Sequence, residues 1–113
     1  MTKDILAAAS FYKRARYFND TYAKLPTQVR DELLAACSLA AEQSRGIVTL
    51  GFYEDGAVFA EAEGAADDLN YDAIGARLIV DTMLEEKAEL LRGLRLWYAA
   101  FRTDEGQAIL QGE

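Results

Sequence analysis

From residue 70 to residue 102, apolar side chains recur at intervals of three and four positions, and charged side chains fall mostly between them. This spacing places the apolar residues on one stripe of an α-helix, wider than the seam of a simple coiled coil. The sequence therefore predicts one long amphipathic helix packed on a globular core, unless Gly75 or Gly93 breaks it. The stripe comprises Val80, Met83, Leu84, Leu90, Leu91, Leu94, Trp97, Tyr98 and Phe101.

Two shorter helices are predicted upstream of this stretch. In residues 3–19, apolar side chains again recur every three or four positions, with basic side chains on the opposite side. The second helix follows Pro26, with Thr27 as its N-cap, and continues to Gly46, a residue suited to end a helix in the left-handed conformation.

After Gly46 the period changes to that of strands. Two runs rich in β-branched and aromatic residues, 47–53 and 57–63, flank an Asp-Gly pair, which is a strong hairpin signal. If Asp55 and Gly56 form a two-residue turn, Phe52 lies opposite Phe59.

These elements predict an α+β fold in one domain, residues 1–113. Three helices, one of them the long C-terminal helix, pack around a single antiparallel β-hairpin, and residues 103–113 form a frayed tail. With 51% apolar and 27% charged residues, the chain has the composition of a folded globular protein.

The net charge of the chain and its distribution indicate which classes of partner are disfavoured. The formal net charge is −7, with 19 acidic and 12 basic residues. Residues 1–30 carry six basic and two acidic residues, whereas residues 31–76 carry ten acidic residues and one arginine. Because an acidic chain is repelled by phosphate backbones, nucleic acid is disfavoured as a partner.

Several chemistries are excluded by residue type. The sequence has no histidine, and Cys37 is its single cysteine, which excludes an internal disulfide, a Cys/His zinc site and histidine-assisted nucleophiles. It also has no glycine-rich phosphate loop and no G-x-S-x-G motif. Cys37 lies on an apolar face and is interpreted as a small core residue. We therefore expect no enzymatic activity, no cofactor and no metal.

The N-terminus does not resemble a signal peptide, and no apolar stretch is long enough to span a bilayer. A cytoplasmic location is the expectation.

One cluster combines basic and aromatic side chains. Lys13, Arg14, Arg16 and Tyr17 would lie on the outer face of the first predicted helix. The favoured interpretation is a solvated cationic face. The alternatives are a docking face for an anionic protein and a site for nucleic acid or a phosphate ligand.

Two groups of acids are candidates for other chemistry. Glu61 and Glu63 share one face of a predicted strand and could act in acid–base catalysis, but a solvated strand end is the favoured interpretation. Asp67, Asp68 and Asp72 precede the long helix. They are interpreted as helix-start residues, with a weak divalent-cation site as the alternative.

Three segments together are similar to a family of small uncharacterised bacterial proteins. They are YFND followed by LPTQVRDEL, the hairpin, and DDLNYDAIG followed by EEKAELLRGLRLWYAAF. The resemblance covers nearly the whole chain. It implies a small α+β domain and adds no activity or site residue.

The favoured function is a homo-oligomeric protein–protein interaction or regulatory module. A straight helix of about 30 residues is about 45 Å long, which exceeds the roughly 35 Å width of so small a domain. A projecting apolar end would need a cover, so we expect a homodimer, with or without pairing of the hairpin edge. The predicted interface residues are Val80, Met83, Leu90, Leu94, Trp97, Tyr98 and Phe101.

Overall fold

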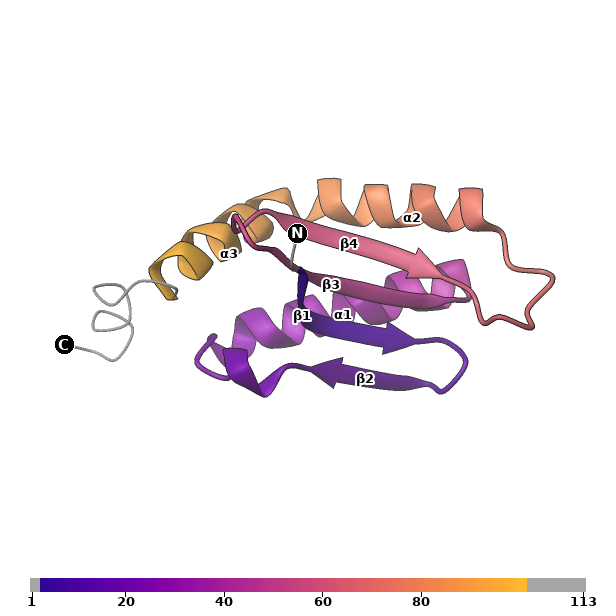
Figure 1. Ribbon diagram of the computed structural model, residues 1–113, viewed down its shortest axis with the longest axis horizontal. Coiled ribbons are helices and arrows are strands. Elements are labelled where there is room, and N and C mark those ends of the chain that lie inside the picture. The colour runs from indigo at the N-terminus through magenta and orange to yellow at the C-terminus, as the bar shows by residue number, and fades with distance from the viewer. Residues whose placement is uncertain (1–2, 102–113) are drawn as a thin grey trace.

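The computed structural model describes residues 3–101 as a four-stranded antiparallel sheet with its helices on one side. In chain order the elements are β1 (Lys3–Ser10), β2 (Ala15–Phe18), a short 3-10 helix η1 (Asp20–Tyr22), α1 (Thr27–Ser44), β3 (Ile47–Tyr53), β4 (Val58–Glu63), α2 (Ala73–Glu86) and α3 (Ala88–Phe101). The strand order across the sheet is β2-β1-β3-β4 (Figure 1). The α+β class and the three α-helices agree with the prediction, but the sheet is larger than a single hairpin.

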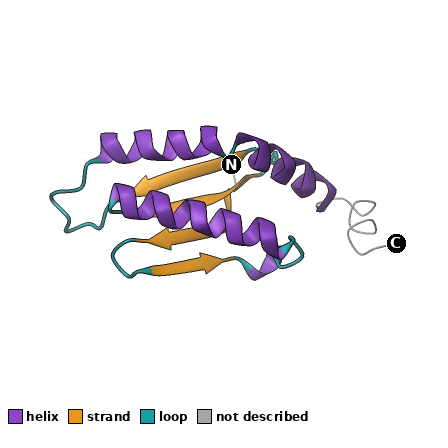
Figure 2. Cartoon of the chain, turned by 180° about the vertical axis from the view of Figure 1, so that it is seen from behind, coloured by secondary structure: helices purple, strands orange, loops and turns teal. Residues whose placement is uncertain are grey.

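The helices form a second layer against one face of this sheet. Figure 2, which views the chain from behind, shows α1 lying in front of the strands and α2 running along the β4 edge. The core lies between the two layers. Val48, Leu50 and Phe52 of β3 are completely or almost completely buried there, together with Leu33 and Cys37 of α1. Alternate residues of a strand point to opposite faces, so this face of β3 is the one that meets the helices.

The prediction of a helix over residues 3–19 is wrong, because this segment forms β1, a turn and β2. β1 pairs with β2 on one side and with β3 on the other. Leu6, Ala7 and Ala9 are buried in the core, and the pairing is irregular between Ile5 and Ala7, where Leu6 is the extra residue. Alanine favours helices in isolation, but pairing on both edges of a central strand overrides that local preference.

The predicted hairpin is confirmed, with a different register. Phe52 pairs with Val58, and Gly51 pairs with Phe59. The turn has three residues instead of two. The Tyr53 amide donates to the Ala57 carbonyl (2.8 Å), and Gly56 adopts a positive φ of 88°. This three-residue loop shifts the pairing by one position and moves Phe59 to the face of the sheet opposite the core.

The single long helix is not observed. The helical stretch divides into α2 and α3 at Lys87, where φ is −103° and ψ is 17°, and not at Gly75 or Gly93. The Lys87 ammonium lies 3.2 Å from a carboxylate oxygen of Glu32 in α1. The break lets α3 turn away from the axis of α2 (Figure 1). The helical stretch is therefore not one straight helix that projects beyond its own domain.

An aromatic cluster holds α3 on the sheet. The Tyr98 ring stacks on Phe52 at 4.1 Å between centroids, with 25° between the ring planes. Tyr22 of η1 packs against both of these rings and against Trp97. Ring pairs of this kind add to the free energy gained by burying the rings alone. The cluster therefore joins η1, β3 and α3 in one core.

The second predicted helix is confirmed as α1, but its N-cap is Pro26 and not Thr27, which is the first helical residue. It ends one residue earlier than expected, because Arg45 and not Gly46 takes the left-handed conformation, with φ 57°. Within residues 3–101, neither α1 nor any other helix combines the length and the hydropathy that a membrane span requires.

Replacing each of two glycines by alanine tests this packing. A Cβ at Gly51 would press against the Asp4 carbonyl oxygen and lie 2.8 Å from the Phe59 ring, whereas a Cβ at Gly93 would meet nothing within 4 Å. We expect Gly51→Ala to lower the free energy of unfolding by about 2 kcal/mol through overpacking. Gly93→Ala should raise it by about 0.5–1 kcal/mol through helix propensity. Urea denaturation measures both changes, and equal effects would contradict the described contacts.

Candidate functional site

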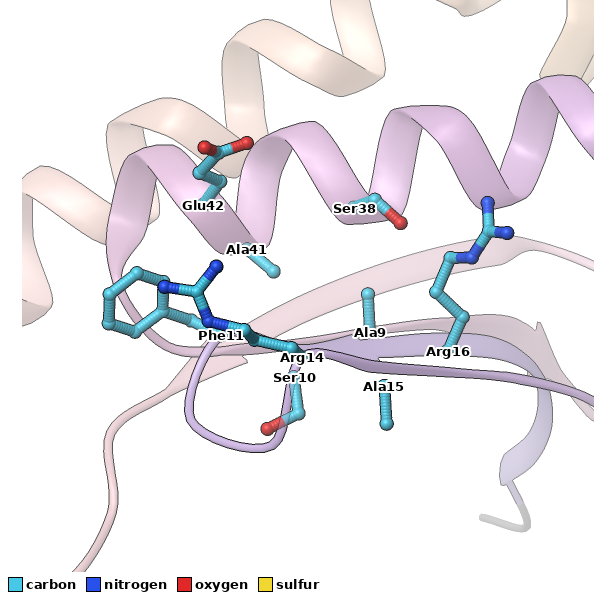
Figure 3. A pocket seen from close by; sticks show the side chains of 9 residues that line it. All are labelled: Ala9, Ser10, Phe11, Arg14, Ala15, Arg16, Ser38, Ala41 and Glu42. Carbon is cyan, nitrogen blue, oxygen red and sulfur yellow. The ribbon is translucent and has the colours of Figure 1, made fainter.

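A cleft of about 270 Å³ lies between the β1–β2 hairpin and helix α1. Figure 3 shows its residues in place: Ala9 and Ala41 face each other across the interior, and two arginines stand on either side. We call it the arginine cleft and define it by Ala9, Arg14, Arg16, Ser38, Ala41 and Glu42.

Local structure brings Arg14 and Arg16 to the same side of the hairpin. Arg16 pairs with Ala9 across the two strands, so its side chain rises toward α1, as Figure 3 shows. Arg14 belongs to the turn and has a left-handed backbone, with φ 49°. This conformation is uncommon for a residue with a side chain and often occurs where function demands a particular geometry. The small side chains of Ala9 and Ala41 leave the space that the arginines flank.

Ser38 lies on α1 between the two arginines (Figure 3). Its hydroxyl oxygen is buried and has no hydrogen-bond partner among the described residues. Buried polar side-chain atoms nearly always have a partner, so an exception at the wall of a cleft needs an explanation. A ligand oxygen that accepts hydrogen bonds from the Ser38 hydroxyl and from an arginine guanidinium would explain this exception.

The cleft also holds unpaired charge. Within residues 3–101, the ion pairs are Lys3–Glu61, Arg77–Asp81 and Lys87–Glu32, and none involves Arg14, Arg16 or Glu42. Two arginines and one glutamate give the cleft a local charge of about +1. Guanidinium groups present planar sets of donors that match carboxylate and phosphate oxygens. The arrangement can therefore hold one small anionic group.

The structure separates the four residues of the predicted anion site. Arg14 and Arg16 line the cleft, whereas Lys13 does not. Tyr17 follows Arg16 in β2 and pairs with Ala8, so it points to the opposite face of the sheet. The expectation of a shared helical face is wrong, since the segment is a strand. Sequence reasoning also missed Ser38 and Glu42, because only the docking of α1 brings them near the arginines.

Most of the predicted interface residues belong to the chain's own core. Val80, Met83, Leu94 and Tyr98 are buried there. Leu90 and Trp97 are partly buried and pack against that core. The side chain of Phe101 lies outside the described residues. The homodimer stays a prediction, but its interface would have to be formed by side chains other than these buried ones.

Glu61 and Glu63 are exposed at the edge strand β4. The Glu61 carboxylate accepts a hydrogen bond from the Lys3 ammonium. Both side chains lie away from the arginine cleft.

The aspartates before α2 organise its start. Asp72 caps the helix by accepting from a backbone amide at 3.0 Å, as the helix-start interpretation predicts. Asp68 accepts from the Tyr12 hydroxyl at 2.7 Å, which connects this loop to the β1–β2 turn. Asp67 is exposed. Within the described part of the chain, no three acidic or cysteine side chains are grouped as a metal site would need.

The chain belongs to the family of unknown function DUF6145, whose sequence model matches residues 3–106. The match includes every described strand and helix. A search of curated proteins and a search of solved structures each found no significant match. The function must therefore be argued from the geometry of the arginine cleft.

Cys37 lies on α1 next to Ser38 but is fully buried, and burial raises the pKa of its thiol to about 12. At about pH 8 the thiolate fraction should be about a thousandfold lower than for a thiol of ordinary pKa, near 8.5. We expect a disulfide reagent to label the native protein far more slowly than the protein unfolded in guanidinium chloride. Equal labelling rates would show that Cys37 is accessible.

Replacing Ser38 tests whether its hydroxyl is without a partner. Ser38→Ala and Ser44→Ala both exchange a helical serine for alanine, but the Ser44 hydroxyl donates to the Ala41 carbonyl at 3.4 Å. We expect Ser38→Ala to give the higher free energy of unfolding, by about 1 kcal/mol, because it removes an unsatisfied buried group. Urea denaturation compares the two variants. A less stable Ser38→Ala would mean that the hydroxyl has a partner in the folded protein.

Proposed function

We propose that this protein is a non-enzymatic binding module whose ligand is a small molecule with a phosphate or carboxylate group, held in the arginine cleft. The observation that carries the proposal is the placement of Arg14 and Arg16 on either side of the unpartnered Ser38 hydroxyl. All three donate hydrogen bonds, and two of them are cationic. Charge-assisted hydrogen bonds from such a set are the strong kind.

A single anionic group suits the cleft better than a nucleic acid. A nucleic-acid surface combines several phosphate contacts with aromatic stacking on the same face. Here Tyr17 and Arg16 point to opposite faces of the sheet, and the acidic residue Glu42 is among those that line the cleft. The net charge of −7 also opposes a long polyanion.

Binding without turnover is the simpler proposal for this cleft. Ser38 is its hydroxyl nucleophile candidate, and a serine needs a hydrogen-bonded base to become reactive. Glu42 lies one helical turn away, but within residues 3–101 no hydrogen bond joins it to the Ser38 hydroxyl. This arrangement supports a binding role for the serine as a donor to the ligand.

A homo-oligomeric interaction or regulatory module in the cytoplasm is the second candidate function. The observation that favours it is the face of the sheet that none of the described helices covers. The two functions are compatible, because the arginine cleft lies on the helix side of the hairpin.

Titration with inorganic phosphate, sulfate and acetate tests the first proposal. Backbone amide shifts in ¹H–¹⁵N spectra should change around residues 9–16 and 38–42. Arg14→Gln combined with Arg16→Gln should weaken phosphate binding at least about tenfold, since each lost charge-assisted bond costs about 1.5 kcal/mol or more. Lys13→Gln removes a charge from the same turn outside the cleft and is the matched control, with affinity changed less than about twofold.

Three results would overturn the proposal. Phosphate shifts that persist in the double variant would place the anion elsewhere. A loss on Lys13→Gln as large as the loss on Arg16→Gln would indicate a diffuse cationic surface. Salt-dependent binding of an oligonucleotide, abolished by Lys13→Glu with Arg16→Glu, would favour nucleic acid.

A further inference from the structure

One face of the sheet has none of the described helices against it. Val48, Leu50 and Phe52 point to the helices, so the alternate residues of β3, including Thr49 and Tyr53, point to the other side. Figure 1 looks onto this side, and Figure 2 shows the helices behind it. We call it the open sheet face and define it by Ile5, Ala8, Tyr17, Thr49, Tyr53 and Phe59.

The open sheet face exposes two large apolar side chains next to the Lys3–Glu61 ion pair. Ile5 is 44% exposed and Tyr17 is 52% exposed, although both are large hydrophobic residues within strands. Phe59 lies over Gly51 but is only 6% exposed, because the Tyr53 ring lies 5.1 Å from its ring and the Lys3 ammonium lies over it. Solvent-exposed apolar side chains that are gathered on one face commonly mark a contact surface.

The two edges of this face carry opposite charge. The turn that leads into β2 carries Lys13, whereas the β4 edge carries Glu63 and also Glu61, which pairs with Lys3. Pairing β4 with the β4 of a second copy would bring glutamates together and is therefore disfavoured. Contact between the open sheet faces of two copies does not bring the β4 glutamates of the two copies together.

A two-fold axis parallel to the strands matches these charges. In the order β2-β1-β3-β4, such an axis between β1 and β3 places the β2 of one copy over the β4 of its partner. The β1–β2 turn and the end of β4 lie at the same end of the sheet, because Ser10 pairs with Ile47 and Ile47 pairs with Glu63. Lys13 of each copy would then approach the second copy's acidic β4 end.

The size of the face suits a weak dimer. Four strands about 4.8 Å apart and on average about six residues long cover roughly 400 Å² in projection, and side chains raise the accessible area above that value. Two such faces approach the lower end of specific interfaces, about 1,200 Å² in total. Micromolar dissociation is the expected range for a contact of this area.

We propose that two copies of this chain associate through their open sheet faces, with the β2 edge of each over the β4 edge of the other, so that Lys13 of each copy lies near the other copy's Glu63. The product is a two-layer sheet sandwich with the helices on the outside. This surface is separate from the arginine cleft, so either proposal can fail without the other.

Sedimentation velocity from micromolar to submillimolar concentration tests the dimer. Ile5→Arg should weaken association at least about tenfold, since it buries a charge in the interface. Ile74→Arg is the matched control, because Ile74 is 79% exposed on α2, far from this face, and should leave association unchanged. Thermal melting verifies that each variant folds, and Tyr17→Arg replaces Ile5→Arg if the latter is unfolded.

Charge reversal tests the orientation of the two copies. Lys13→Glu should weaken the dimer about fivefold, because an exposed pair of modest strength occurs twice in a two-fold interface. Adding Glu63→Lys to that variant should restore at least part of the association. A chain that stays monomeric over the whole concentration range would overturn the proposal. So would a dimer that survives both Ile5→Arg and Tyr17→Arg, or one that Ile74→Arg abolishes.

Discussion

The pairing of β1 with strands on both of its sides is the interaction on which the structure depends. It joins the β1–β2 hairpin to the β3–β4 hairpin and makes one sheet from two parts that would each be marginal alone. The buried residues of β1 include Ala7 and Ala9, whose small side chains let α1 approach closely. Without this strand, α1 would have only half a sheet to cover, and the core would lose one of its walls.

The aromatic cluster at the other end of the sheet explains why the helical stretch breaks. Tyr98 must reach Phe52, which lies in β3 next to the turn. A straight helix continuing along α2 would carry Leu94 and Tyr98 away from the core. The break at Lys87 redirects α3 so that both side chains are buried. Because these residues are buried in the chain's own core, an interface with another chain would have to use other side chains, such as those on the opposite side of the sheet.

The arginine cleft depends on the same strand pairing. Arg16 faces α1 because it is opposite Ala9, and the gap beside Ala9 remains open because neither Ala9 nor Ala41 has a side chain large enough to fill it. Thus one alanine-rich strand serves two purposes: it allows close packing along most of α1 and leaves a cleft where the packing ends. Burial of the Ser38 hydroxyl without a described hydrogen-bond partner is expected to cost stability.

Patterns within short segments determined the parts of the fold that were predicted correctly. Helix α1, the hairpin strands β3 and β4 and the helical state of residues 73–101 follow from local periodicity, a proline before the helix and an Asp-Gly turn. Only the tertiary structure decided that residues 3–10 and 15–18 are strands, since β3, the partner of β1, lies dozens of positions away and alanine itself favours helix. It also decided the hairpin register, the break at Lys87 and the meeting of Arg14 and Arg16 with Ser38. Each of these depends on contacts between distant segments, which no local pattern of side chains records.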